Sequence, residues 1–248
     1  MPLRERIYAP QLHENILIET HFPPGFTRLS APFPAVVLND CQNCWTERGS
    51  YGGWHTDRIA WWLYRKGLLR PVVLIGVYPP NWRDRSFGPP PRGRIDRYAD
   101  FLSDTLLPIY RKRFGIHPGP EGIACIGASY GANAALGVGI LRPDAVGNIG
   151  AMSAAPHFGK PLPKWISERR FLPLRRLWID AGNRWAYDDP YSYDGDETSW
   201  NRNLIAVARR HMHAGRFRGR IWPGHFHNEE WWRKRIGKIL HFFFGRRP

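Results

Sequence analysis

The junction of two apolar runs at residues 121–137, EGIACIGASYGANAALG, constrains the fold of this chain most strongly. The first run predicts a buried strand, and the second, rich in alanine, predicts a helix. Between them Gly127 and Gly131 flank Ser129. Glycines at these two positions let a strand and a helix approach closely, with the serine exposed at a sharp turn. The pattern predicts a nucleophilic Ser129 on a strand-to-helix turn; a small residue in a Gly-rich loop is the alternative.

The rest of the chain alternates apolar runs with amphipathic ones. Continuous apolar runs predict strands covered on both faces at 34–40 and 71–78. Residues 147–155 and 176–182 are predicted as two more core strands, and 218–224 as the last strand. Runs at 14–20 and 26–30 predict two opening strands that pair antiparallel. Helical periodicity predicts helices at 54–67, 93–115 and 228–244, the second with a kink or break near Pro108. This order predicts a mostly parallel, doubly wound α/β sheet with helices on both faces.

The length and the charge bound the class of protein. The 248 residues suit a single α/β domain, 1–248, with a lid-like excursion at 156–173. The formal charge of +15 favours anionic surroundings such as nucleic acid, anionic lipid or an acidic polymer. No nucleic-acid-binding signature accompanies the basic clusters, so we do not expect a nucleic-acid partner. The apolar runs are too short to span a bilayer, and the first residues lack the apolar core of a signal peptide. We therefore expect a cytoplasmic protein, with a secreted mature form as the alternative.

Three cysteines are too few for a disulfide framework. Cys41 and Cys44 form a CxxC in a loop punctuated by Pro and Gly, after a predicted strand. A zinc site would need a second pair of ligands, and a redox pair would stand at a helix start. We therefore expect no metal, no cofactor and no redox role.

A serine hydroxyl needs a base to become a nucleophile. In a fold with this turn, the partners follow in the order serine, acid, histidine, with the histidine after the final strand. The segment WPGHFHNEEWW supplies His225 and His227 there. The loop after 176–182 should supply the acid, and Asp188 or Asp189 is our choice. The other acids of this region are Asp180, Asp194, Asp196 and Glu197.

An oxyanion hole needs two backbone N–H donors aimed at the developing charge. One should come from Tyr130, the residue after the nucleophile, and the other from Cys41 or Gln42, after the strand at 34–40. Gln42, Trp45 and His225 are expected to contact the substrate. Further pocket candidates, or loop anchors, are Trp54, Trp82, Trp165 and Trp185.

Five blocks in the same order carry a family resemblance, from about Val36 to Ile236. They are LNDCQNCW, YGGWHTDRIAWWLYRKGLLRPVVLIGVYPPNWRD, YADFLSDTLLPIYRKRFG, RPDAVGNIGAMSAA and GHFHNEEWWRKRI. These blocks resemble the Putative esterase family, which includes enterochelin esterases, S-formylglutathione hydrolases, feruloyl and acetylxylan esterases and mycolyltransferases. The resemblance implies an α/β-hydrolase fold and hydrolysis of a carboxylic ester or thioester without a cofactor.

Carried over by position, the resemblance implies that Ser129 is the nucleophile and His227 the base. His225 would then line the site or pack beneath it. Cys41 takes the glycine position of the family's oxyanion loop, where its side chain is expected to crowd the pocket. Arg184 stands where members usually carry the acid, so either Asp188 or Asp189 serves from a longer loop, or a Ser–His dyad works alone.

The sequence thus favours a serine esterase that forms an acyl-enzyme on Ser129. The substrate is expected to be a small-molecule or carbohydrate-linked ester. Transfer to an alcohol instead of water is a variant of the same chemistry. A different class is a non-catalytic binding protein on the same fold, whose basic, Trp-rich surface holds an anionic or carbohydrate partner. The two hypotheses differ in whether Ser129 must be reactive.

Overall fold

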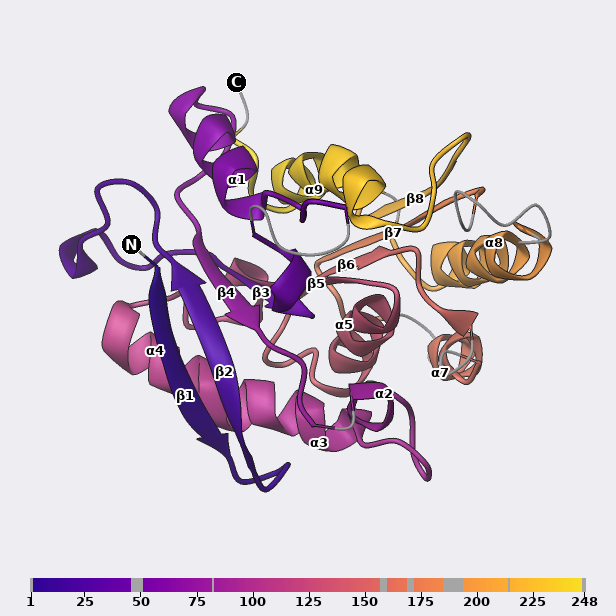
Figure 1. Cartoon of the computed structure of the whole chain (residues 1–248), viewed down its shortest axis with the longest axis horizontal. Coiled ribbons are helices and arrows are strands. Elements are labelled where there is room, and N and C mark those ends of the chain that lie inside the picture. The colour runs from indigo at the N-terminus through magenta and orange to yellow at the C-terminus, as the bar shows by residue number, and fades with distance from the viewer. Residues whose placement is uncertain are drawn as a thin grey trace.

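A sheet of eight strands forms the centre of the molecule in the described residues (Figure 1). The computed structural model describes residues 2–45, 51–81, 83–156, 160–168, 172–184, 194–213 and 215–246. The spatial order is β1-β2-β4-β3-β5-β6-β7-β8, and the strands from β4 to β8 are parallel. Their bounds are β1 Leu3–Ala9, β2 Glu14–His21, β3 Ala35–Asn39, β4 Val73–Val77, β5 Ile123–Ala128, β6 Asn148–Met152, β7 Arg176–Gly182 and β8 Phe217–Trp222. The predicted doubly wound sheet is confirmed.

The opening pair differs from the prediction. The strand β2 pairs antiparallel with β1 and with β4. The predicted strand at 26–30 is wrong, because residues Arg28–Ser30 form a short 3-10 helix, η1. Leu29 within it is almost fully exposed, so this segment has no apolar face to bury. By contrast, β1 alternates exposed Arg4 and Arg6 with inward Ile7, the pattern of an edge strand with one solvated face.

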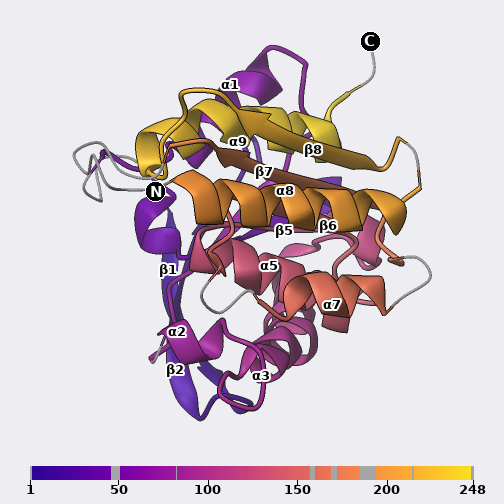
Figure 2. The same cartoon turned by 90° about the vertical axis from the view of Figure 1, so that its right-hand side faces the viewer.

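Helices cover both faces of the sheet (Figure 2). The bounds of the longer helices are α1 Thr56–Arg65, α3 Ile95–Asp100, α4 Leu107–Phe114, α5 Tyr130–Leu141, α7 Leu162–Ser167, α8 Asp194–Arg210 and α9 Glu229–Phe244. Shorter ones are η2 Cys41–Asn43, α2 Arg83–Ser86 and η4 Pro120–Gly122. The predicted break near Pro108 takes the form of a π-helical turn, Phe101–Leu106. It is followed directly by α4, which begins at Leu107 and has Pro108 in its first turn.

Two apolar cores follow from the alternation of side chains along the strands. On one face, Val37 belongs to the core that packs under α3, α4 and α5 and includes residues of α7 and α8. On the other face, its neighbours Val36 and Leu38 join the core beneath α1 and α9. Because both faces are covered, β3 to β6 are buried along their whole length. None of the helices in the described residues is long and apolar enough to cross a bilayer.

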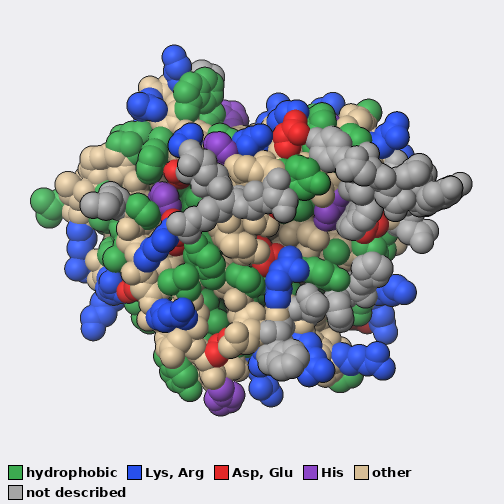
Figure 3. Space-filling model, in the orientation of Figure 1, with side chains coloured by type: hydrophobic (Ala, Val, Ile, Leu, Met, Phe, Trp, Pro, Cys, Tyr) green, Lys and Arg blue, Asp and Glu red, His purple; other side chains and the backbone are tan. Residues whose placement is uncertain are grey.

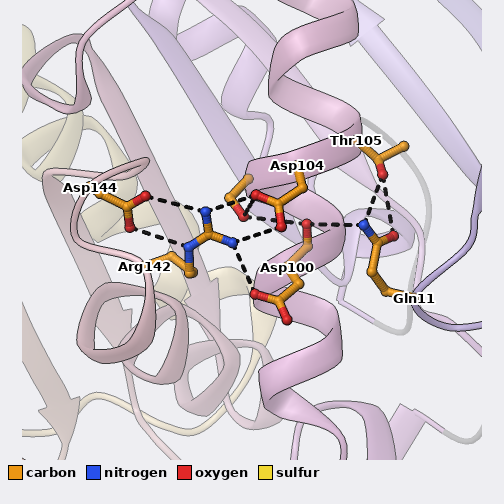
Figure 4. A network of polar contacts seen from close by, with 7 residues as sticks. Gln11, Asp100, Asp104, Thr105, Arg142 and Asp144 are labelled. Carbon is orange, nitrogen blue, oxygen red and sulfur yellow. Dashed lines mark hydrogen bonds and ion pairs between the residues drawn. The ribbon is translucent and has the colours of Figure 1, made fainter.

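Arg142 fixes the far end of α5 (Figure 4). Its guanidinium donates to Asp100 at 2.9 Å, to Asp104 at 3.0 Å and to Asp144 at 3.2 Å. The pKa of Asp104 is lowered, chiefly by its hydrogen bond with Arg142. These contacts hold the C-terminal end of α5 against the helix that contains the π turn. The N-terminal end of α5 is therefore presented at the opposite edge, where the candidate site lies.

Candidate active site

Ser129 stands at the predicted turn between β5 and α5. Its backbone has φ 55° and ψ −124°, a strained conformation for a residue with a Cβ. A Cβ added at Gly127 would lie 2.0 Å from the carbonyl oxygen of Gly131, so this position requires glycine. The amide of Ser129 donates to the carbonyl of Met152 at 3.0 Å, which ties the turn to the end of β6. The side chain of Ser129 is half-buried at the start of a helix, where the helix dipole favours negative charge.

Asn39 connects this turn to the end of β3, and sequence reasoning missed it. Its buried amide group donates to the carbonyl of Gly131 at 3.1 Å. Its own oxygen accepts from the hydroxyl of Tyr98 at 2.6 Å. A buried amide that is paired on both sides holds one orientation, because leaving either group unpaired is costly. Asn39 therefore fixes the spacing between the end of β3 and the first turn of α5.

The loop after β3 carries the second predicted oxyanion donor. Asp40 takes the left-handed conformation, with φ 56°, and Cys41 begins the 3-10 helix η2. Arg83 forms a bidentate ion pair with Asp40, and its guanidinium lies 4.9 Å from the ring centre of Tyr130. One arginine thus contacts both the loop with Cys41 and the residue that follows Ser129. The two predicted oxyanion donors, Tyr130 and Cys41, come from the ends of neighbouring parallel strands.

The side chain of Cys41 lies in the core. Its sulfur is 2.6 Å from the place where a Cβ on Gly76 would stand, so the bare glycine of β4 accommodates it. Cys41 and Cys44 are fully buried, and burial raises the pKa of both thiols. Trp45 is also buried and stacks on His21, with ring centres 4.1 Å apart. These side chains anchor the loop, whereas Gln42 and Asn43 are half-buried.

His227 lies in the loop between β8 and α9, at the predicted position after the last strand. Its Nδ1 atom is 3.9 Å from Oε2 of Glu197, a residue of α8. The imidazole packs edge-on against Trp232, with ring centres 5.0 Å apart. Burial, with a further contribution from the charge of Arg235, lowers the pKa of His227 to about 3. The ring is therefore neutral near pH 7, which is the state that a general base requires.

A series of contacts leads from His227 back to Ser129. The indole N–H of Trp232 donates to the hydroxyl of Ser153 at 3.2 Å. Ser153 directly follows Met152, whose carbonyl accepts from the amide of Ser129. A small cavity is lined by His227, Glu197 and Ser153 among others. Ser129 is not among its described lining residues and lies at the neighbouring strand end.

The described residues do not test our choice of acid. Asp188 and Asp189 lie outside the described residues, as do Trp82 and Trp185. Among the described residues, Glu197, named above only among the other acids, has its carboxylate 3.9 Å from His227. No motif in the sequence distinguishes Glu197, because it stands on a helix that we did not predict. The 17 residues of α8 pack against β7 and β8, and Glu197 shares a small cavity with Ser153 and Gly182.

Asp180 has a different role at the end of β7. Its carboxylate is fully buried and accepts from Arg235 at 2.8 Å, from Trp178 at 3.0 Å and from Trp222 at 2.9 Å. Arg235, also fully buried, donates in turn to Ser153 at 3.2 Å. This ion pair lies below the cavity and supports Ser153. Asp180 is therefore fully engaged as a structural acid.

His225 packs beside the site. Its ring stacks on Trp222 at 5.4 Å and contacts Trp231 at 4.3 Å between ring centres. Its carbonyl accepts from the amide of Arg184, and a Cβ on Gly182 would lie 1.9 Å from that oxygen. The bare glycine thus lets the loop of the two histidines close over the end of β7. In the described residues no three His, Cys, Asp or Glu side chains gather in a way that could hold a metal ion.

Comparison with known proteins shows the family of the chain. A family model described as Putative esterase matches residues 9–243, so the chain belongs to that family. A curated relative, the uncharacterized protein YbbA of Bacillus subtilis, is 24% identical over 145 residues. That match covers 54% of this chain and 55% of YbbA, so it spans about half the length of the relative.

Solved structures share the fold at low identity. The enterobactin esterase FES of Shigella flexneri has a TM-score of 0.76 at 16% identity, over 97% of this chain and 58% of its own. An IroE-like serine hydrolase of Shewanella oneidensis has a TM-score of 0.76 at 17% identity, over 98% and 80%. The siderophore hydrolase EstB of Aspergillus nidulans has a TM-score of 0.74 at 16% identity, over 98% and 94%. The α/β-hydrolase fold expected from the sequence is confirmed.

Proposed function

We propose that this member of the Putative esterase family hydrolyses a carboxylic ester or thioester through an acyl-enzyme on Ser129. The observation that carries the proposal is the strained turn at Ser129, taken together with the carboxylate contact of His227. Ser129 has φ 55° at the start of α5. His227 is neutral near pH 7, and its Nδ1 atom lies 3.9 Å from Oε2 of Glu197. A serine on such a turn becomes a nucleophile when a neutral imidazole backed by a carboxylate takes its proton.

The imidazole nitrogens have different tasks in this proposal. Nδ1 faces the carboxylate of Glu197, so it carries the proton and Nε2 keeps the lone pair. Nε2 takes the proton of the Ser129 hydroxyl as the serine oxygen attacks the ester carbonyl. The protonated ring then gives this proton to the leaving alcohol or thiol. At 3.9 Å the Nδ1–carboxylate contact is longer than a hydrogen bond, and such contacts shorten when substrate binds.

The oxyanion of the tetrahedral intermediate would be stabilised by the N–H groups of Tyr130 and Cys41. Tyr130 is the first residue of α5, so the helix dipole reinforces its N–H. Asn39 and Arg83 hold the two loops at a fixed spacing. Water activated by His227 then attacks the acyl-enzyme and releases the acid, which regenerates Ser129.

Steady-state kinetics with p-nitrophenyl esters of short and medium acyl chains test the proposal. Ser129→Ala and His227→Gln should each lower kcat by about 10⁴-fold or more. Without the nucleophile or the base, only substrate binding and the oxyanion hole still accelerate the reaction. Ser167→Ala, an exposed serine on α7, is the matched control and should keep full activity. Activity in Ser129→Ala equal to that of the unsubstituted protein would overturn the assignment of Ser129 as the nucleophile. An unsubstituted protein that hydrolyses none of these esters would favour a binding protein.

A further inference from the structure

A groove of about 960 Å³ lies between α1 and α9, outside the catalytic residues. Both views of the fold show these two helices side by side on one face of the sheet. Figure 3 shows basic and hydrophobic side chains gathered at the end of the molecule where α1 lies. Ser129, His227 and Glu197 are not among the described residues that line the groove. It is therefore a second site.

The groove is positively charged. Two basic runs far apart in the sequence, YRKGLLR and WWRKRIGK, meet in it. Arg58 and Arg65 line it from α1, and Arg233 and Lys238 line it from α9. No Asp or Glu is among its described lining residues. The nearby Glu230 pairs with Lys234 at 2.8 Å, which leaves the lining with an excess of positive charge.

The groove also exposes large apolar side chains. Trp62 is 52% exposed and Leu68 is 41% exposed, and both line it. In the part of the chain that the structure describes, exposed apolar side chains of this size are few. An exposed indole and an exposed leucine rimmed by arginine and lysine can bury apolar area and pair anionic groups in one contact.

We propose that this groove docks the protein on an anionic phospholipid surface. Lipid phosphates would lie among Arg58, Arg65 and Lys238, while Trp62 and Leu68 reach the boundary between headgroups and acyl chains. Aromatic and leucine side chains beside Lys and Arg are the composition by which proteins lie in a membrane interface. A nucleic acid would satisfy the cations but leave Leu68 without an apolar partner, so the lipid surface fits both halves of the groove.

Sedimentation with vesicles tests the contribution of the basic side chains of the groove. We expect association with vesicles of phosphatidylcholine that contain about one part in three of phosphatidylglycerol, and little with phosphatidylcholine alone. Arg65→Gln combined with Lys238→Gln should weaken association on the order of 30-fold, from the usual contribution of each basic residue near an anionic leaflet. Arg209→Gln with Arg210→Gln removes the same charge from an exposed end of α8 and should leave association unchanged.

A separate variant tests the apolar side chains of the groove, Trp62 and Leu68. Trp62→Ser should weaken association with anionic vesicles about tenfold. At high salt, where the attraction between charges is screened, this variant should also retain less association than the unsubstituted protein. Ser129→Ala should bind vesicles as the unsubstituted protein does, so docking and catalysis are tested separately. The proposal would be overturned if the protein did not sediment with anionic vesicles, or if the groove variants and the α8 variants lost vesicle association equally. It would also be overturned if the protein bound single-stranded RNA but no vesicles.

Discussion

The Nδ1 atom of His227 lies 3.9 Å from the carboxylate of Glu197, which reaches it from the first turns of α8. This contact brings together α8 and the loop between β8 and α9, and no pattern in the sequence predicts that they meet. The same small cavity is lined by Glu197, His227 and Ser153. In the proposed mechanism Glu197 orients the ring and stabilises its protonated form.

Substitution of Glu197 tests this role. Glu197→Gln should lower kcat by between about 10-fold and about 10⁴-fold, with a much smaller change in KM, because the carboxylate acts when the imidazole becomes charged. Steady-state kinetics on the best ester substrate measure the effect. Asp188→Asn and Asp189→Asn are the matched variants. If either of them causes the loss and Glu197→Gln does not, the acid has been assigned to the wrong residue.

The pH dependence of kcat/KM tests the environment of His227. Activity requires the neutral ring, so it falls as the pH drops through the pKa of His227 in the free enzyme. Since burial lowers that pKa to about 3, we expect kcat/KM to stay high well below pH 6.5. Circular dichroism at each pH separates loss of base from loss of fold. An acid limb centred near pH 6.5 would show that the imidazole is solvated in the working enzyme.

The strand-to-helix turn could be predicted in detail, because the close approach that requires glycine at position 127 is local, against the carbonyl of Gly131. The strands β3 to β6 could be predicted because their apolar runs are continuous and buried. The edge strand β1 was missed because its alternating charges resemble a loop. The helix α8 was missed because its polar first turns hide the apolar stripe, and Glu197 was passed over with it. Asn39 and Arg83 gain their roles only from tertiary contacts that no spacing in the sequence reveals.

The buried pair of Asp180 and Arg235 should dominate the stability of the site. Arg235→Met leaves the Asp180 carboxylate buried with only two indole donors, which should lower the free energy of unfolding by about 3–5 kcal/mol. Urea denaturation followed by circular dichroism measures this. Adding Asp180→Asn to Arg235→Met should recover part of the loss. The exposed Arg209→Met on α8 should change stability by less than about 0.5 kcal/mol. A similarly small effect of Arg235→Met would contradict the prediction.

The close approach at the turn predicts a different cost for two glycines. Gly127→Ala would place its methyl group 2.0 Å from the carbonyl of Gly131, so β5 and α5 must move apart. We expect a loss of more than about 3 kcal/mol and no esterase activity. Gly25→Ala meets open space and carries only the strain of a positive φ, about 1–2 kcal/mol. Equal losses in the two variants, measured by thermal unfolding, would count against a tight turn.

Labelling with a fluorophosphonate probe tests the activation of Ser129 most directly, because it requires no choice of substrate. The adduct is mapped by mass spectrometry in the folded protein, in His227→Ala and in a heat-unfolded control. We expect one adduct, on Ser129, that is absent from His227→Ala and from the unfolded chain. A folded protein that takes no label, or that keeps the Ser129 adduct without His227, would show that Ser129 is not activated by His227.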